Sequence, residues 1–238
     1  AALVLVALSP LWTGKPDPAA FTLGNFEFVL FNHDLARRAM VNSLIVATLG
    51  ASIGVLIGTL QSYYLSRGRS RLRTVMDAFL SLPIGIPGII LGLGFLILAL
   101  RTPLYSTLWI ILIAYIARFL PFATRGISAM LVSLSTDLEE SARAGGATWL
   151  QTMRLIVLPL IWPAILAAWL MLFVIFIREL GATILLYAQG TETISVAMVI
   201  MGEMNFGYVA ALAVIQALLL FVAFVLFRLT RSSLLESS

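Results

Sequence analysis

The residues with the most distinctive spacing in this chain lie in a polar stretch between two long apolar segments. They are Glu140, Ser141, Ala142, Gly146, Ile156, Leu158 and Pro159. This group of residues is suited to binding by another protein. The carboxylate can be recognised by a partner, the small side chains permit close approach, and the glycine permits a bend. This stretch is the part of the chain best suited to be held by a partner.

Two short helices should position these residues. Thr136, with Glu139 three residues later, fits a capping box that starts the first helix, and Gly145-Gly146 provides a left-handed stop. A second capping box begins at Thr148, and we expect its helix to run to Pro159. The stretch is therefore predicted to be a bent pair of helices at a membrane surface.

The residue types available argue against catalysis. The chain has no cysteine and one histidine, His33, so it lacks a thiolate metal site, a cysteine nucleophile and a histidine ligand cluster. It also lacks a glycine-rich phosphate-binding loop with Lys and Ser or Thr. We therefore predict no catalytic residue, no metal site, no cofactor and no ATPase activity, and we expect His33 to be solvated or at headgroup level.

Arg118, Arg178 and Glu179 lie deep inside apolar segments, whereas Arg125 lies nearer the end of its segment, where its long side chain can reach the membrane surface. An ionisable group near the bilayer centre costs several kcal/mol unless it is paired or hydrated. Consecutive helical residues point about 100° apart, so Arg178 and Glu179 are not expected to neutralise each other on one face. A cross-helix pair between Glu179 and Arg118 is one interpretation, and a place in a gate or translocation path is the other.

Two prolines, Pro83 and Pro87, lie near the start of an apolar segment. Each removes a backbone donor and blocks a regular helical turn. Irregular backbone at membrane depth persists only where it is buried in protein or lines a cavity. The segment is therefore either a packing kink or a wall of a translocation path.

Membrane spans are the elements that must position these residues. The chain is 61% hydrophobic and 11% charged, with a mean hydropathy of +1.05, whereas a soluble domain has about 25% charged residues. A helix needs about 20 apolar residues to span the hydrocarbon core. The segments of that length are Met40–Leu65, Ala78–Leu100, Leu108–Leu131, Ile161–Ala182 and Val209–Arg228. The apolar run Ala1–Trp12 is shorter, so we expect it to be a truncated first helix. Together these segments predict an all-α, polytopic bundle of about six helices, forming a single domain over 1–238.

The distribution of basic residues predicts the orientation. If the spans alternate, the polar stretch shares its side with Arg67, Arg69, Arg71, Arg73, Arg228 and Arg231. Fewer basic residues lie on the other side, namely Lys15, Arg37, Arg38 and Arg101. The positive-inside rule then places the polar stretch in the cytoplasm. The net charge of +4 comes largely from arginines next to apolar spans, where they orient the protein in the membrane. No nucleic-acid partner is therefore expected.

Other segments predict packing and outer loops. Glycines at every fourth position over 50–58 favour close helix contact in lipid. On the outer side, Thr13–Arg38 is expected to be an ordered loop with a short amphipathic helix. Tyr187–Gly207 is expected to be a second excursion with a helix around Ile194–Met201.

The polar stretch resembles the EAA loop, the cytoplasmic coupling element of binding-protein-dependent ABC import permeases of the MetI-like type. That pattern is Glu-Ala-Ala, three residues, Gly, nine residues, then Ile, any residue, Leu-Pro. The positions from Glu140 to Pro159 fall in register, with Ser141 in place of one Ala. The resemblance implies that residues 136–160 bind a cytoplasmic ABC ATPase dimer. It also implies a second permease half, fused or separate, and an external solute-binding protein, assembled in a bacterial inner membrane.

Finer similarity suggests a cargo. Ser81–Gly94, Arg178-Glu179-Leu180 and Leu185–Val196 resemble the ferric-iron subgroup, in which one polypeptide often holds two homologous halves. This chain resembles the second half, so ferric iron is the expected solute, with thiamine, polyamines, phosphonates and sulfate as alternatives within the family. A secondary transporter or channel is the alternative of another class, because broken helices and membrane charges suit both. Neither accounts for the coupling pattern.

Overall fold

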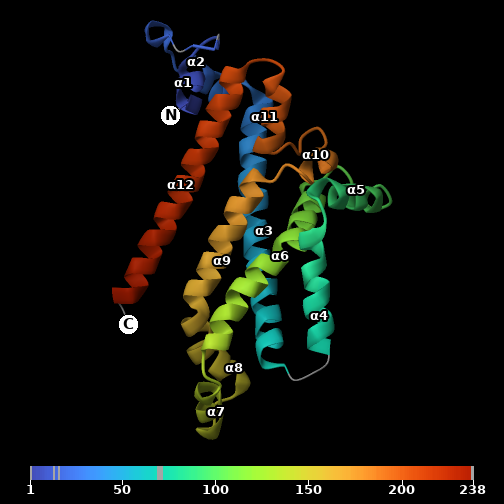
Figure 1. Ribbon diagram of the computed structural model, residues 1–238, viewed down its shortest axis with the longest axis vertical. Coiled ribbons are helices and arrows are strands. Elements are labelled where there is room, and N and C mark those ends of the chain that lie inside the picture. The colour runs from blue at the N-terminus through green and yellow to red at the C-terminus, as the bar shows by residue number, and fades with distance from the viewer. Residues whose placement is uncertain (1, 13, 16, 69–71, 237–238) are drawn as a thin grey trace.

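The computed structural model describes residues 2–12, 14–15, 17–68 and 72–236, and the regular elements in these ranges are helices. Arg69 and Arg71, used above to predict orientation, lie outside the described residues, as does the side chain of Arg231. Figure 1 shows a long bundle with a group of short helices at each end.

Four helical stretches in the described residues are long and apolar enough to cross a membrane. They are α3 (Asp34–Arg67), α6 (Leu108–Ser133), the stretch Trp149–Arg178 that contains α9 (Leu158–Arg178), and the Phe206–Leu229 part of α12 (Phe206–Glu236). Helix α3 packs against α6 and α9. The glycines over 50–58 line this contact, opposite Phe176, Leu172 and Ala123. The prediction that they form a packing face is confirmed.

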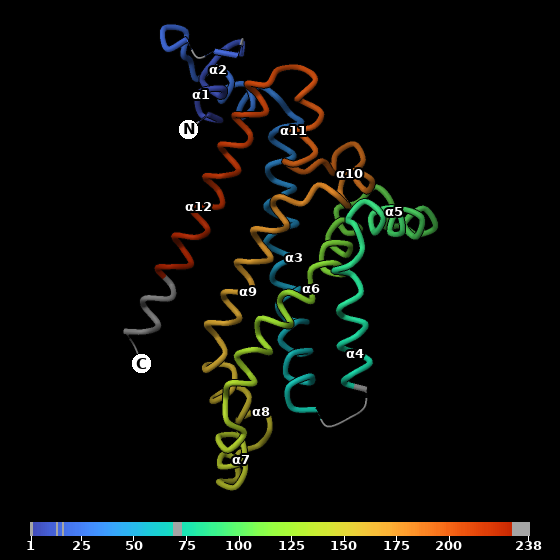
Figure 2. Tube along the Cα trace, viewed as in Figure 1, coloured from blue at the N-terminus to red at the C-terminus, as the bar shows by residue number. Residues whose placement is uncertain are grey.

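The second expected span is broken. Helix α4 (Leu72–Ser81) leads into a 3-10 turn, η3 (Leu82–Gly85), and α5 (Gly88–Ala99) then turns away by 106° (Figure 2). The irregular backbone predicted at the two prolines is therefore present, and the apolar segment predicted over Ala78–Leu100 is a bent pair of helices that begins earlier, at Leu72. Pro83 lies in the turn and Pro87 is the N-cap of α5, so both prolines stand where the missing backbone donors are tolerated. Counting this bent pair as one span gives five in the described residues, beside the short α1 (Ala2–Leu8).

One end of the bundle carries the segments predicted to be external. It holds α1, η1 (Pro18–Ala20), α2 (Gly24–Glu27), the π-helical turn η2 (Phe28–Asn32), and α11 (Ile194–Gly202). The helix predicted around Ile194–Met201 is thus confirmed. His33 is the N-cap of α3, where its Nδ1 accepts a hydrogen bond from the Ala36 backbone N–H at 3.4 Å.

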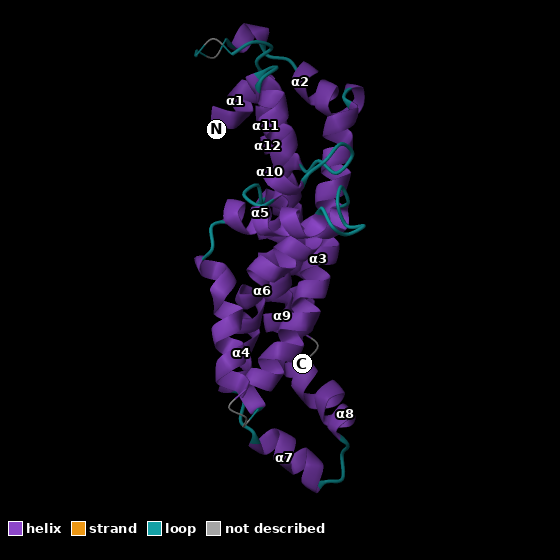
Figure 3. Ribbon diagram, turned by 90° about the vertical axis from the view of Figure 1, so that its right-hand side faces the viewer, coloured by secondary structure: helices purple, strands orange, loops and turns teal. Residues whose placement is uncertain are grey.

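The opposite end carries the predicted bent pair. It consists of α7 (Asp137–Ala144), α8 (Trp149–Thr152) and the π-helical turn η4 (Met153–Val157), which continues into α9. Figure 3 shows α7 and α8 projecting beyond the ends of the long helices. Arg67 and Arg143 lie at this end, as the arginine distribution predicted.

Candidate functional site

The bend between α7 and α8 has the predicted left-handed geometry. Gly146 has φ +86°, a backbone conformation that side chains with a Cβ rarely adopt. The Gly146 N–H donates to the Arg143 carbonyl at 3.0 Å, and the Ala147 N–H donates to the Ala142 carbonyl at 3.0 Å. These two bonds satisfy carbonyls at the end of α7 and fix the direction of the next helix.

Only the second of the two predicted capping boxes forms. The Gln151 N–H donates to Thr148 Oγ1 at 3.3 Å, and the Thr148 N–H donates to Gln151 Oε1 at 2.8 Å. Thr136, by contrast, makes no side-chain cap at the start of α7. The first capping box was therefore a wrong prediction, because the Glu139 carboxylate that should complete it is bound elsewhere.

Glu139 connects α7 to the end of α3. Its side chain is 5% exposed and accepts hydrogen bonds from Arg67 Nε at 2.8 Å and from the Tyr63 hydroxyl at 2.9 Å. Arg143, four residues on, adds a longer ion pair at 3.3 Å. Arg67 also donates to the Leu134 carbonyl at 3.1 Å. We call Tyr63, Arg67, Glu139 and Arg143 the Glu139 cluster. It ties the bent pair to the span that packs against both α6 and α9.

The next residue, Glu140, points the other way. Glu140 and Ser141 are exposed, while Ala142 is half-buried. Large apolar side chains around the bend are also exposed, with Leu138 at 47% and Trp149 at 54%. The bend therefore offers a carboxylate, small residues and apolar side chains together, the mixture expected of a surface that another protein covers. Ser141 stands where the family pattern has Ala. Because Ser141 is exposed, water can hydrogen-bond its hydroxyl, which needs no partner within the protein.

The C-terminal part of the motif leads into α9. Ile156 and Leu158 are half-buried, and Pro159 lies in the first turn of α9. The prediction that the helix stops at Pro159 is wrong, because the chain stays helical from Trp149 to Arg178. The wider π-helical turn η4 places the proline at the start of α9, where an absent backbone donor is tolerated.

An ion pair joins α6 to the segment after α9. Arg118 Nη1 lies 2.5 Å from Glu179 Oε1, and the same oxygen accepts a hydrogen bond from the Ala182 N–H at 3.1 Å. The cross-helix pairing of Arg118 with Glu179 is confirmed. Glu179 is the C-cap of α9, so the expectation that Arg178 and Glu179 lie deep within a span over Ile161–Ala182 is wrong. Arg178 is exposed and takes no part in this pair.

The broken span rests on this ion pair. A Cβ at Gly88, the first residue of α5, would collide with the Arg118 guanidinium, and one at Gly92 would approach the Ala182 backbone to 2.8 Å. Tyr115 fixes the segment after α9 from the other side, donating to the Glu179 carbonyl at 3.1 Å. The structure thus brings Pro87, Arg118 and Glu179 together through Gly88, while Pro83 lies half-buried in η3 against α6.

Sequence reasoning missed three contributors to these arrangements. Arg67 was used only to predict orientation, and Tyr63 and Gly88 were given no role. Gly88 follows Pro87 directly, which is a local signal for close backbone approach. For Tyr63 and Arg67, partners about seventy residues away in the chain leave no local signal.

A bundle of apolar spans with an exposed, polar helical bend at one end defines the chain as a polytopic helical membrane protein. The description "Binding-protein-dependent transport system inner membrane component" belongs to the family that matches residues 50–234. The chain belongs to this family, and it is a multi-pass inner-membrane protein of the ABC importer permease type.

Two curated relatives illustrate the similarity. The putative 2-aminoethylphosphonate transport system permease protein PhnV of Salmonella paratyphi A is 30% identical over 200 residues, covering 83% of this chain and 74% of that protein. The Fe(3+)-transport system permease protein FbpB 2 of Haemophilus influenzae is 31% identical over 162 residues, covering 67% of this chain and 32% of that protein.

A solved structure supports the fold. A chain of a bacterial ABC transporter involved in the import of the acidic polysaccharide alginate matches with a TM-score of 0.72 at 22% identity. The match covers 95% of this chain and 87% of that one. The likeness therefore extends over nearly all of the bundle.

Proposed function

We propose that this chain, as one transmembrane domain over 1–238, forms half of the solute path of an ATP-driven importer. In this proposal residues 136–160 bind a cytoplasmic ATPase dimer, a second permease half completes the path, and an external binding protein delivers the solute. The observation that carries the proposal is the exposed bend beside a buried tether: Glu140 faces outward while Glu139 holds α7 to α3. ATP hydrolysis belongs to the partner subunit.

The geometry supports transmission of force through α3. When the ATPase dimer closes, it displaces α7, and the Glu139 cluster passes that displacement to the end of α3. Helix α3 packs along both α6 and α9, so the three move together. Farther along the bundle, Arg118 near the middle of α6 pairs with Glu179 at the end of α9, and the Arg118 guanidinium contacts Gly88, next to the break between α4 and α5. We propose that Arg118, Glu179, Pro83 and Pro87 form part of the gate, and that Arg178 lines the path.

A cysteine crosslinking experiment tests the coupling role. Glu140→Cys, in the assembled importer, should crosslink to the ATPase subunit, and Glu140→Gln should reduce ATP-dependent uptake. Glu27→Gln is the matched control, because it makes the same change at an exposed glutamate in α2, at the opposite end of the bundle from residues 136–160. If Glu140→Cys never reaches the ATPase, or if Glu140→Gln transports as well as Glu27→Gln, the coupling proposal is wrong.

We propose ferric iron as the transported solute. The similarity of Ser81–Gly94 and Leu185–Val196 to the ferric-iron subgroup supports it, as does the relative named for Fe(3+) transport. A phosphonate is the second candidate, because the relative named for 2-aminoethylphosphonate transport matches a larger share of this chain.

Uptake into proteoliposomes containing the complete importer and its binding protein separates the candidates. Radiolabelled ferric iron and 2-aminoethylphosphonate are supplied in turn, with and without ATP inside. Uptake of iron alone supports the first proposal, and uptake of the phosphonate alone supports the second. Uptake that does not require the ATPase subunit would instead indicate a secondary transporter or channel.

A further inference from the structure

The outer end of α3 is tied to the loop that joins α10 (Thr183–Leu186) to α11. The side-chain amide of Asn42 donates two hydrogen bonds to this loop, to the Gly190 carbonyl at 3.0 Å and to the Glu192 carbonyl at 2.9 Å. Asn42 and Glu192 are buried, and a hydrogen bond lost at a buried position is costly. One side chain of α3 therefore holds the loop at two points.

The loop closes its own turn before α3 attaches to it. Gly190 has φ +94°, and its N–H donates to the Glu192 carboxylate, with both carboxylate oxygens at 3.0 Å. Because the turn is closed by its own residues, the Asn42 amide attaches it to α3 as a unit.

Ser43, the next residue of α3, caps the start of α11. The first N–H groups of a helix lack intrahelical partners. Thr193, the N-cap of α11, supplies no side-chain hydrogen bond, and its hydroxyl is buried without a partner among the described residues. The Ile194 N–H donates instead to Ser43 Oγ at 2.8 Å. Helix α11 thus takes its cap from α3.

Helix α3 is tied near both faces of the membrane. Asn42 and Tyr63 are about 32 Å apart along the helix axis, close to the roughly 30 Å thickness of the hydrocarbon core. Tyr63 belongs to the Glu139 cluster at the inner end. The sequence of α3 contains no proline, whereas α6 contains Pro121 and α9 contains Pro163. Since proline kinks a helix, α3 is the least easily bent of the three packed helices.

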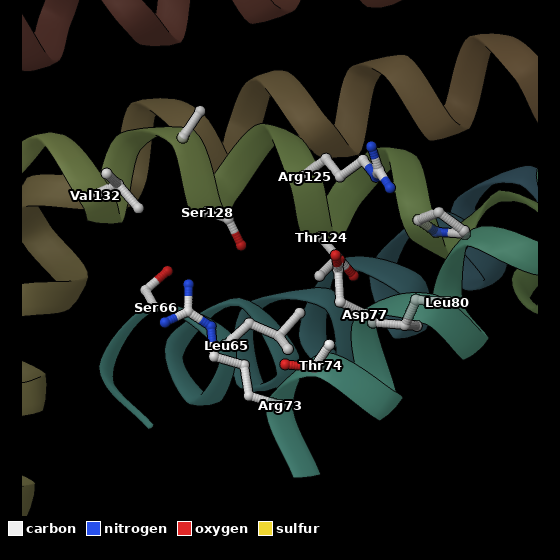
Figure 4. A pocket seen from close by; sticks show the side chains of 12 residues that line it. Leu65, Ser66, Arg73, Thr74, Asp77, Leu80, Thr124, Arg125, Ser128 and Val132 are labelled. Atoms are coloured by element: carbon white, nitrogen blue, oxygen red, sulfur yellow. The ribbon is translucent and has the colours of Figure 1, made fainter. Parts of the chain in front are cut away.

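The inner end of α3 has room to move beside α4. A cavity of about 610 Å³ lies between the last turns of α3, α4 and α6 (Figure 4). Leu65 and Ser66 of α3 line this cavity, while Arg67 is bound to Glu139 of α7. Close-packed interfaces transmit strain, whereas side chains that line a void lack partner atoms on that side. A shift of α7 can therefore move the end of α3 without displacing α4.

We infer that Asn42 and Ser43 are positioning residues that make the outer loop and the start of α11 move as one body with α3. This inference rests on the proposed function. An external binding protein contacts the outer loop, where Gln189 and Gly190 are exposed, and α3 carries the displacement to the Glu139 cluster and the bend. Contact at the outer face then changes how the bend binds the ATPase, and by linkage the ATPase changes affinity at the outer face.

ATP hydrolysis that depends on the binding protein tests this relay in proteoliposomes containing the complete importer. The binding protein is loaded with ferric iron or with 2-aminoethylphosphonate in turn, and the hydrolysis rate in its presence is divided by the rate in its absence. In the wild type this ratio should differ from 1. Asn42→Ala and Ser43→Ala should bring it toward 1, while hydrolysis without the binding protein persists. Asn42→Asp keeps the size of the side chain and removes the N–H donors, so it should match Asn42→Ala.

Asn25→Ala is the matched control. Asn25 is also buried at the outer end, and its amide also donates to two backbone carbonyls, those of Ala7 at 2.9 Å and Ser9 at 2.8 Å. These bonds hold α2 to the end of α1 and do not involve α3. The variant loses the same number of hydrogen bonds as Asn42→Ala, and it should leave the ratio at its wild-type value.

Thiol labelling tests the attachment itself, without a solute. The chain has no cysteine, and Thr193→Cys replaces a buried hydroxyl that has no hydrogen-bond partner among the described residues. A membrane-impermeant maleimide added outside should label this chain slowly, and addition of ATP should not change the rate. Asn42→Ala in the same background should speed labelling roughly fivefold or more, because two hydrogen bonds are lost. Asn25→Ala should not speed it.

Four results would overturn the inference. They are a wild-type ratio of 1 in an importer whose uptake requires the ATPase subunit, a wild-type ratio retained by Asn42→Ala, an equal fall in Asn25→Ala, and faster labelling on addition of ATP. The last would show that the loop leaves α3 during the cycle. Failure of the proposed function is distinguishable, because uptake would then not require the ATPase subunit, while labelling would still report whether Asn42 holds the loop.

Discussion

Replacing Glu139 with Gln should uncouple ATP hydrolysis from transport. The change keeps the shape of the side chain and removes the charge that Arg67 and Arg143 face. Breaking a buried ion pair by removing one partner costs about 3–5 kcal/mol. Arg67 is 17% exposed and retains some hydration, so we expect the lower end of that range. About 3 kcal/mol corresponds to a change on the order of 100-fold in the ratio of docked to detached α7.

Two rates measured on the same proteoliposomes check this prediction. ATP hydrolysis should persist, because Glu140 and the exposed bend are untouched, while solute uptake per ATP should fall. Glu140→Gln is the neighbouring isosteric control, and it should lower both rates together by weakening contact with the ATPase. The double variant Arg67→Gln with Glu139→Gln should recover part of the coupling, because it no longer leaves Arg67 buried without its carboxylate.

Two results would refute the reasoning. If Glu139→Gln transports at the wild-type rate per ATP, the cluster does not transmit force. If it lowers hydrolysis and uptake together, as Glu140→Gln is expected to do, both glutamates serve the same contact and the tether has no separate role. Protein abundance in the membrane, measured alongside, distinguishes either result from a failure to fold.

Other substitutions probe the bend and the ion pair. Gly146→Val should abolish uptake with the protein still inserted, because a β-branched residue at φ +86° is strained by about 1–3 kcal/mol, whereas Gly146→Asn should retain most uptake. Thr148→Ala should weaken the start of α8 by about 1 kcal/mol, seen as a lower thermal unfolding temperature of the purified protein. Glu179→Gln should reduce membrane abundance, and joint replacement with Arg118→Met should restore part of it. Gly88→Leu should displace the Arg118 guanidinium and reduce uptake; unchanged uptake would show that α5 does not rest on the pair.

The sequence by itself determined the features that depend on neighbouring residues. Span lengths follow from apolar runs, so the segment Leu108–Leu131 matches α6 closely, the segment Val209–Arg228 matches the Phe206–Leu229 part of α12, and Met40–Leu65 lies inside the longer α3. The left-handed turn at Gly146 and the cap at Thr148 were predictable because each involves residues within one or two turns. The coupling pattern is equally local, which is why the family could be inferred before the fold was known.

The tertiary structure decided which of several possible partners each polar group takes. Glu139 could cap α7 or reach another helix, and the half-buried Arg67 and Tyr63 favour the second. Pro83 and Pro87 required a break, but its angle of 106° depends on α5 resting against the Arg118–Glu179 pair. A local pattern limits the conformations open to a segment. Contacts between residues distant in the chain then select one of them, because only those contacts determine which charges are buried together.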